Sequence, residues 1–165
     1  MNTTISIELF EEHDKVNFYT LRFQNEETEI EKFFDKFPED CEFDEDIEII
    51  IKWMDQIGKR GALERYFRPE GKRKDNVWAI PVETSSLRLY VLRLSENILI
   101  LGNGDVKTTK KYNEDTFLSK CVELLQEVDG YLKARINKEQ ISVYQKQLFG
   151  NLRFKVKSNY EESET

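Results

Sequence analysis

Two stretches near the start of the chain alternate hydrophobic and polar residues. Residues 3–10 (TTISIELF) and 16–23 (VNFYTLRF) place an apolar side chain at nearly every second position. This alternation is typical of strands that bury one face. The short polar segment between them, residues 11–14, suits a tight connection. We therefore expect these two stretches to form a β-hairpin.

Three further segments show the three-to-four-residue spacing of amphipathic helices. They cover residues 26–37, 46–59 and 113–135. Pro38 ends the first helix, because proline cannot donate a helical hydrogen bond. Acidic residues begin the second helix, and Lys59, Arg60 and Gly61 end it, as the helix dipole and the C-cap preference favour. A short additional helix is expected at residues 62–67.

The middle of the chain predicts three antiparallel strands. They cover residues 77–82, 87–94 and 98–101. The last strand is apolar at every position and is therefore expected at the centre of the sheet. Gly102, Asn103 and Gly104 come next, and we expect them to end that strand. Weak alternation over residues 141–156 predicts another hairpin, which turns near Gly150.

These elements together predict an α+β fold in which a curved antiparallel sheet packs against helices. At 165 residues, the chain is long enough for one domain with a substantial core. We place this single domain at residues 1–157. The acidic segment 158–165 has few apolar side chains and is expected to be a flexible tail.

Charge is divided unevenly along the chain, whose net charge is −7. Residues 1–55 hold 17 acidic and 5 basic side chains, whereas residues 56–112 hold 6 acidic and 12 basic ones. Residues 113–165 are nearly balanced, with 9 acidic and 8 basic side chains. An acidic protein is not attracted to nucleic acid as a whole, but its basic middle segment can form a local binding patch.

Several kinds of catalytic site find little support in the sequence. The only histidine, His13, lies in a predicted turn, which disfavours Ser/His or Cys/His catalysis. Cys41 and Cys121 lack the spacing of a metal site, and the acidic residues 39–48 lack the calcium-loop pattern. The Gly-rich residues 102–107 match neither a P-loop nor a dinucleotide-binding loop. We therefore expect a protein without a metal or another cofactor.

The sequence also bears on location. No stretch approaches the roughly 18 apolar residues of a membrane span, and no secretion signal is recognisable. The two cysteines do not form a disulfide framework. We expect a cytoplasmic protein that does not bind membranes.

The main candidate for a functional site is a set of basic residues in the middle of the chain. Its catalytic candidates are Arg88, Lys107, Lys110 and Tyr112, and its RNA-binding candidates are Arg65, Arg68, Lys72, Arg73 and Lys111. RNA can be cleaved without a metal when a ribose 2′-hydroxyl attacks the neighbouring phosphate. This reaction needs a proton acceptor, cations that stabilise the phosphorane, and a donor to the leaving oxygen. Arg and Lys can supply the charge, and Tyr112 can stack on a base or donate a proton.

Arg88 is of particular interest because it interrupts an apolar strand. Alternation puts Arg88, Tyr90 and Leu92 on one face of that strand and the residues between them on the other. A charged group in such a place needs a carboxylate, a carbonyl or a bound phosphate as its partner. An internal ion pair with Glu70 or Glu83 and a phosphate site are both compatible with the sequence.

The order of elements and two motifs resemble the RelE/HigB-like toxin superfamily. The resemblance covers roughly residues 46–125: a helix pair, VWAIPVE, LRLYVLRLSENILILGNGDVKTTKKY and a further helix. Members of the family carry an Arg-bearing strand, then an apolar strand, then a Lys-rich segment. Here LRLY at residues 87–90 matches the first motif, and KTTKK at residues 107–111 matches the last.

The resemblance implies a RelE-like core at about residues 46–137, with residues 1–45 as an N-terminal extension. It also implies ribosome-dependent cleavage of mRNA and neutralisation by an antitoxin protein. The residues that match the family best are Arg88, Lys107 and Lys110, followed by Arg68, Arg73 and Tyr112. The chain departs from the family because it is longer and acidic, and it has Asn103 near the place where some members use a histidine.

Two functions are therefore considered. The first is a metal-independent, ribosome-dependent mRNA endoribonuclease that is controlled by an antitoxin, or a relative of such enzymes that has lost catalysis. The second is a non-catalytic protein-interaction domain of RelE-like fold, which pairs with a second copy of itself. The partners expected on these grounds are an antitoxin, the ribosome with its mRNA, and another copy of the chain.

Overall fold

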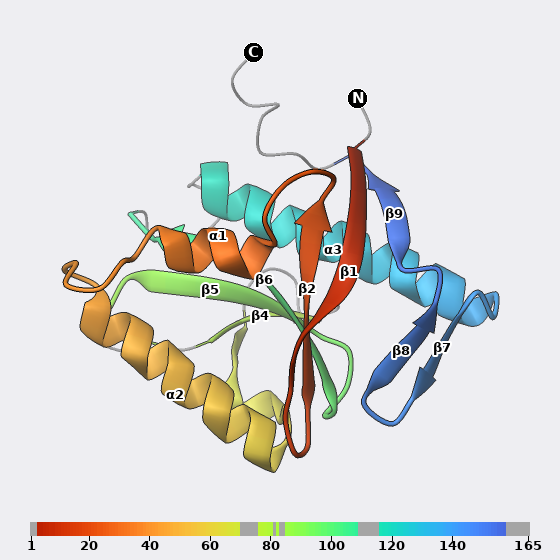
Figure 1. Ribbon diagram of the computed structural model, residues 1–165, viewed down its shortest axis with the longest axis horizontal. Coiled ribbons are helices and arrows are strands. Elements are labelled where there is room, and N and C mark those ends of the chain that lie inside the picture. Colours follow the sequence, from red (N-terminus) through yellow and green to blue (C-terminus); the bar gives the residue numbers. More distant parts are fainter. Residues whose placement is uncertain (1–2, 70–75, 81, 83–84, 109–115, 158–165) are drawn as a thin grey trace.

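The computed structural model of the protein describes residues 3–69, 76–80, 82, 85–108 and 116–157 (Figure 1). Its elements in chain order are β1 (Thr3–Glu12), β2 (Asn17–Phe23), α1 (Glu29–Asp35), α2 (Asp44–Arg60), the 3₁₀ turn η1 (Glu64–Tyr66), β3 (Arg68–Pro69), β4 (Val77–Ile80), β5 (Leu87–Arg93), β6 (Ile98–Val106), α3 (Thr116–Asn137), β7 (Ile141–Tyr144), β8 (Gln147–Gly150) and β9 (Arg153–Val156). The predicted helix at residues 62–67 is reduced to η1.

Within the described residues, seven strands form one mixed sheet in the order β3-β4-β5-β6-β2-β1-β9. The predicted α+β class is confirmed. The sheet was expected to be antiparallel, and one strand pair departs from this: β2 and β6 pair in parallel, from Asn17 opposite Ile98 to Thr20 opposite Leu101. This pairing arises because the chain leaves β2 through two helices and three strands and returns beside it as β6.

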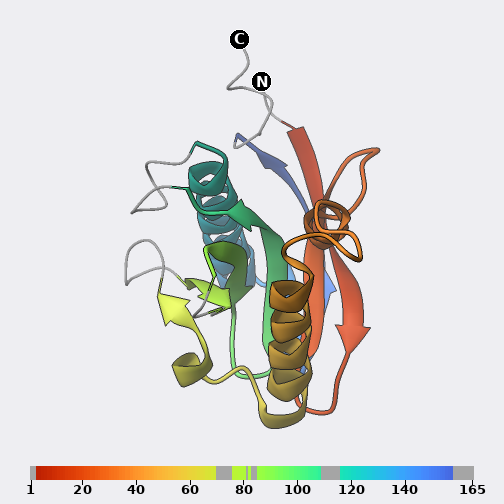
Figure 2. The ribbon, with the colours of Figure 1, turned by 90° about the vertical axis from the view of Figure 1, so that its left-hand side faces the viewer.

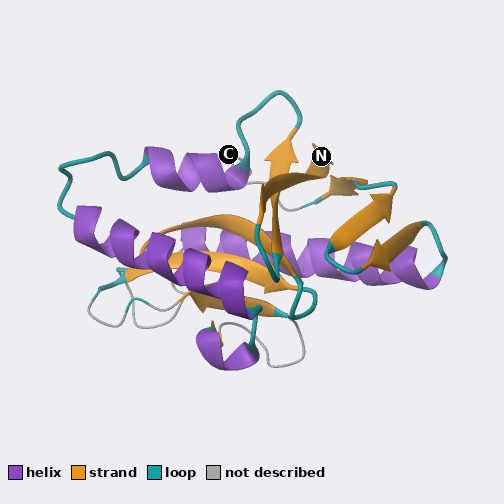
Figure 3. Ribbon diagram, turned by 60° about the horizontal axis from the view of Figure 1, so that its bottom comes forward, coloured by secondary structure: helices purple, strands orange, loops and turns teal. Residues whose placement is uncertain are grey.

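Helices cover both faces of the sheet, as two views of the molecule show (Figures 2 and 3). On one face, α3 packs over a core that includes Tyr90 and Leu92 of β5. On the other face, α1 and α2 pack over a core that includes Leu89 and Val91. We refer to these as the α3 side and the α2 side. Because side chains alternate along β5, this strand contributes residues to both cores, as expected for a strand inside a three-layer structure.

The amino-terminal hairpin of β1 and β2 forms as predicted, with pairs from Ile5 opposite Phe23 to Glu12 opposite Asn17. Its strand β2 lies at the centre of the sheet between β1 and β6. Helix α1 then begins with a capping box, in which the Thr28 side chain and the Glu31 side chain each accept from the other residue's backbone N–H. The first 45 residues therefore contribute two strands and a helix to the main body of the fold.

Strand β6 continues through the residues that were expected to end it. Gly102, Asn103 and Gly104 belong to β6, so that prediction is wrong. A bulge places Gly102 and Asn103 opposite Tyr90 alone, because Leu89 pairs with Gly104 and Val91 with Leu101. Gly104 permits a very close strand approach, since a Cβ there would lie 1.8 Å from the Arg88 carbonyl oxygen. These glycines allow the bulge and do not break the strand.

The carboxyl-terminal residues also differ from the prediction. The hairpin consists of β7 and β8 and turns between Tyr144 and Gln147, so a turn near Gly150 is wrong. Gly150 instead leads out of β8 toward β9, with a φ of +122° that favours glycine. Strand β9 pairs with β1 at the edge of the main sheet. Figure 1 shows the β7–β8 hairpin beside the last turns of α3.

Candidate functional site

The register of the sheet gathers three of the predicted cationic residues. Arg88 is on the α3 side with Tyr90, and its Cα partner on β6 is Asp105. Lys107 comes two residues after Asp105, and its N–H donates to the Ser86 carbonyl oxygen at 2.7 Å. Because side chains alternate along a strand, Arg88, Asp105 and Lys107 are expected on one face.

Arg68 belongs to the same face, at the edge of the sheet. It lies opposite Ala79, which in turn lies opposite Tyr90. Two strand spacings and two residue steps separate Arg68 from Arg88, which gives about 12 Å between their Cα atoms. We call Arg68, Arg88 and Lys107 the cationic face. Arg68 is exposed, whereas Arg88 is buried.

Arg88 is held by the backbone around it. Only 7% of the residue is exposed, and its Nη1 donates to the carbonyl oxygens of Ser85 at 3.1 Å and Leu87 at 2.9 Å. The sequence allowed a carboxylate, a carbonyl or a bound phosphate as the partner of Arg88, and the structure shows two carbonyls in this role. Glu70 and Glu83, the proposed ion-pair partners, lie outside the described residues. The carbonyl contacts hold the guanidinium at the start of β5, next to the end of β6.

Of the other predicted site residues, Arg65 alone lies within the described ranges, and it is not part of this face. Arg65 lies over the Tyr66 ring at 5.2 Å, and that ring belongs to the core on the α2 side. Burial raises the pKa of Tyr66, but hydrogen bonds from Arg60 and Arg65 outweigh it and lower that pKa. The remaining predicted residues lie outside the described part of the chain: Lys72, Arg73, Lys110, Lys111 and Tyr112.

The ends of the two parallel strands form the second part of the site. After Thr20 and Leu101, β2 leads into α1 on the α2 side, whereas β6 continues beside β5 toward α3 on the other side. We call the place where the two connections diverge the branch point. Thr20 Oγ1 donates to the Leu101 carbonyl at 2.8 Å and accepts from the Ile30 N–H at 3.3 Å, and these two bonds hold the branch point in place. In sheets with parallel strands, ligands bind beyond the strand ends where the following connections diverge.

A lysine that the sequence did not single out occupies this branch point. The Lys36 ammonium donates to the Gly104 carbonyl at 2.7 Å and to Asn103 Oδ1 at 3.1 Å. It also lies 3.9 Å from Asp105 Oδ2 and 4.0 Å from the centroid of the Phe117 ring. Burial lowers the pKa of Lys36, although the Asp105 carboxylate opposes the change. We call Lys36, Asn103, Asp105 and Phe117 the strand-end cluster.

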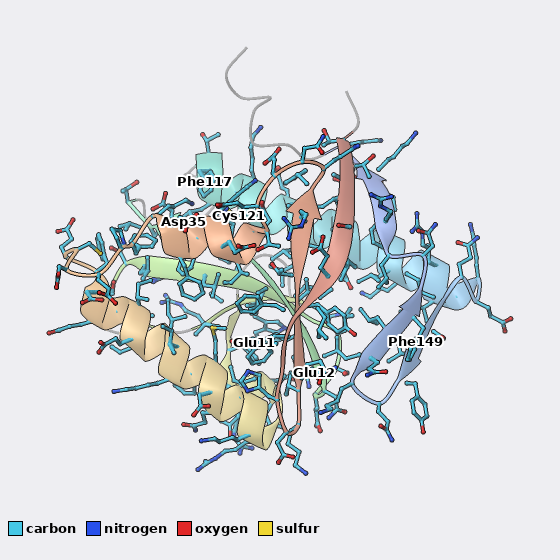
Figure 4. The ribbon with its side chains drawn as sticks, in the orientation of Figure 1. Glu11, Glu12, Asp35, Phe117, Cys121 and Phe149 are labelled. Atoms are coloured by element: carbon cyan, nitrogen blue, oxygen red, sulfur yellow. The ribbon has the colours of Figure 1, made fainter. Side chains whose placement is uncertain are left out.

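The cluster joins three elements that are distant in sequence. Lys36 is the C-cap of α1, Asn103 and Asp105 lie on β6, and Phe117 lies in the first turn of α3. Figure 4 shows Phe117 on α3 close to Asp35 at the end of α1. Asp105 is the accessible acid of the cluster, with 42% of its side chain exposed, and it is the direct cross-strand neighbour of Arg88. The strand-end cluster and the cationic face therefore meet at Asp105.

One sequence pattern could have pointed to Lys36. Glu29, Lys32 and Lys36 are three and seven positions apart, so they share one face of α1. Glu29 is fully buried, and its carboxylate lies 2.9 Å from the Lys32 ammonium. A charged stripe on a helix whose other face is apolar is usually solvated. Here, part of the stripe packs against the end of β6.

His13, which the sequence placed in a turn, belongs neither to the cationic face nor to the strand-end cluster. Its Nε2 lies 3.1 Å from Glu11 Oε1, and its ring packs on Phe18 at a centroid distance of 4.6 Å. It also fills the space above Gly58, where an added Cβ would lie 2.5 Å from the imidazole. Figure 4 shows Glu11 near α2, away from Phe117. This histidine therefore ties the first hairpin to α2.

Comparisons with known proteins add no relative: no family model, curated protein or solved structure matches the chain. Among the described residues, no group of three or more His, Cys, Asp or Glu side chains is arranged to hold a metal ion. No helix in the described ranges is both long and apolar enough to cross a bilayer. The site is therefore characterised by its own geometry alone.

Proposed function

We propose that the protein is a RelE/HigB-like toxin-type endoribonuclease, which cleaves mRNA on the ribosome and is neutralised by an antitoxin protein. One observation carries the proposal: the cationic face and an accessible carboxylate, Asp105, meet at the end of β6. Metal-independent RNA cleavage needs this combination of positive charge and a proton acceptor.

The proposed chemistry assigns a role to each group. Asp105 accepts the proton of the ribose 2′-hydroxyl, whose oxygen attacks phosphorus and forms a cyclic phosphate. Arg88 and Lys107, with Lys110, stabilise the charge on the phosphorane. The 5′-oxygen leaves with a proton from Tyr112. Lys36 positions this site, because its ammonium binds the backbone and side-chain oxygens of residues 103 and 104.

Induced expression without a partner protein tests the proposal. We expect growth arrest and new mRNA 5′ ends, mapped by primer extension. Asp105→Asn should lower cleavage about 100-fold or more through loss of the general base. Lys107→Ala should lower it by a similar factor through loss of one charge on the phosphorane. Lys52→Ala, an exposed change on α2, is the matched control and should remain fully toxic.

Two results would reject the endoribonuclease. One is unimpaired growth with intact mRNA at full expression of the folded wild-type chain. The other is cleavage that Asp105→Asn and Lys107→Ala leave unchanged. Circular dichroism of each purified variant separates lost chemistry from lost folding.

The carbonyl contacts of the buried Arg88 favour a second candidate, a non-catalytic protein-interaction domain that forms a homodimer. In this case Arg88 is structural, and the acidic and basic regions recognise protein. Complexes recovered from the native host should then resist ribonuclease. A gene for a small helix-turn-helix protein beside this one would favour the toxin-type function instead.

A further inference from the structure

A second basic region lies at the carboxyl-terminal end of the described chain. Residues 130–157 contain seven Lys or Arg side chains and one acidic side chain. The near-neutral balance of residues 113–165 conceals this, because acidic residues precede and follow the segment. The segment forms the end of α3, the β7–β8 hairpin and β9, which lie together on one side of the molecule (Figure 1).

Strand β9 and the residue after it present a row of cations. Arg153, Lys155 and Lys157 are exposed, while Phe154 and Val156 between them are buried. The exposed residues therefore share one face of an edge strand, about 7 Å apart. None of the three forms an ion pair with a residue in the described ranges. A row of this kind can follow the phosphates of an extended nucleic-acid strand.

Two carboxylates of the described residues of α3 lie near this row, and both have partners. Glu127 accepts from the Lys157 N–H at 2.7 Å and from the Tyr131 hydroxyl at 3.0 Å. Asp129 pairs with Lys133 at 2.8 Å. The charge of Asp129 is therefore offset by Lys133, and Glu127 is occupied by two donors.

A groove of about 560 Å³ runs beside β9, and none of the described residues in its wall is acidic. It is lined by Thr4, Tyr131, Arg135, Asn151, Arg153, Phe154 and Lys155. The Tyr131 and Phe154 rings are stacked with centroids 5.9 Å apart, and the Arg135 guanidinium lies 4.2 Å from the Phe154 centroid. Arg135 also donates to the carbonyls of Asn151 and Arg153. The wall is thus aromatic, cationic and held in place.

The β7–β8 hairpin adds exposed aromatic rings. Tyr144 is 66% exposed and Phe149 is 48% exposed. Tyr144 pairs with Gln147, and Phe149 with Ser142, so the two rings are diagonal neighbours on one face. The hairpin is anchored, because the Leu148 N–H donates to the Tyr19 hydroxyl at 3.0 Å. Rigid exposed rings on neighbouring strands are suited to stacking with unpaired bases.

We infer that the β9 row, its groove and the hairpin rings form a binding surface for single-stranded RNA. The row and the groove meet the phosphates, and Tyr144 and Phe149 meet bases. The row and the groove lie along the carboxyl-terminal half of α3, where Glu127, Tyr131 and Arg135 contact them, whereas Arg88 and Lys107 lie near its amino end, about 15 to 30 Å away along the helix. Figure 4 shows the labelled Phe149 and Phe117 on opposite sides of the molecule. This inference does not depend on the cleavage proposed above.

The inferred RNA-binding surface can be tested by measuring the affinity of the full chain for RNA by fluorescence anisotropy. The probe is a labelled single-stranded RNA of about 12 nucleotides, a length within the usual site sizes. The triple variant R153S/K155S/K157S should reduce the slope of log affinity against log salt by about 2, since each phosphate contact contributes about 0.7. The double variant Y144S/F149S should weaken binding about 5-fold or more and leave the slope unchanged.

The matched control is K52S/K59S/R60S, which removes three exposed cations from α2 and should bind like the wild type. If the two triple variants lost RNA affinity to the same extent, only the net charge would matter and the inference would be overturned. So would an absence of wild-type binding at about 50 mM salt, where such contacts are strong. The assay contains no ribosome and scores no cleavage, so its result is independent of the proposed endoribonuclease.

Discussion

Two glycine-to-alanine substitutions should have opposite effects on stability. In β6, a Cβ at Gly104 would lie 1.8 Å from the Arg88 carbonyl oxygen and 3.0 Å from Leu89 Cα. Since real Cβ contacts are not shorter than 3.0 Å, β5 and β6 must separate by more than 1 Å at this point. In α3, nothing lies within 4 Å of a Cβ added at the exposed Gly130.

The magnitudes follow from these surroundings. Gly104→Ala should break about two ladder hydrogen bonds, each with a net value near 1 kcal/mol, and strain a packed core by a further 1 to 3 kcal/mol. We therefore expect a loss of about 3 to 5 kcal/mol, a large part of a typical free energy of unfolding. Gly130→Ala should stabilise the protein by about 1 kcal/mol, because alanine is the better helix former.

Urea unfolding followed by circular dichroism measures both changes. With a slope near 2 kcal/mol per molar urea, the midpoint should fall by about 2 M for Gly104→Ala and rise by about 0.5 M for Gly130→Ala. If Gly104→Ala unfolds at the wild-type midpoint, the close approach of β5 and β6 is not real. The position of Asp105 opposite Arg88 would then also be in question.

Three smaller changes test the surroundings of the strand-end cluster. Lys36→Met should alter the pH dependence of stability: the folded-state pKa of Lys36 is lowered by burial, so the unfolded chain binds more protons at alkaline pH. The free energy of unfolding of the wild type should then rise relative to Lys36→Met as the pH approaches 10.5, and urea titrations that stay parallel would contradict this. Thr28→Ala removes the capping box with Glu31 and should cost about 1 kcal/mol in thermal or urea unfolding, whereas Glu31→Gln should cost less. Thr20→Val removes the hydroxyl that bonds the Leu101 carbonyl and should cost about 1 to 3 kcal/mol; no loss would mean that this bond does not hold the branch point.

Local patterns were sufficient to predict most of the elements. Alternation identifies β1, β2 and β5, and it correctly puts Tyr90 and Leu92 on one face of β5. The parallel pairing of β2 with β6 could not be predicted in the same way, because it joins residues about 80 positions apart and depends on how helices cover the sheet. For a related reason, Gly102 and Gly104 were predicted to end the strand, whereas they form part of a bulge within β6. A strand break and a bulge that needs close backbone approach have the same local sequence.

The site shows the same division between local and distant information. The interest in Arg88 follows from one charge inside an apolar strand, which sequence displays directly. Lys36 could not be found that way, because its partners Asn103 and Gly104 are more than 60 positions away. The basic surface at β9 was hidden for a different reason, since averaging charge over a long window cancels a positive segment against its acidic neighbours.

The distribution of charge limits how the protein can approach a polyanion. Residues 1–55 hold 17 of the 32 acidic side chains, and exposed members such as Glu45, Glu48 and Asp55 line α2. Helix α2 covers one face of the sheet and Arg88 lies on the other, whereas the β9 cations are on an edge strand, on the face opposite Phe154 and Val156. A polyanion is therefore repelled by the acidic residues of α2 and attracted to the cationic face and to β9. Because both effects weaken within about 10 Å at moderate salt, they steer orientation before contact, while the local cations determine affinity. A net charge of −7 is thus compatible with binding RNA, provided that the cationic face or the β9 cations make the contact.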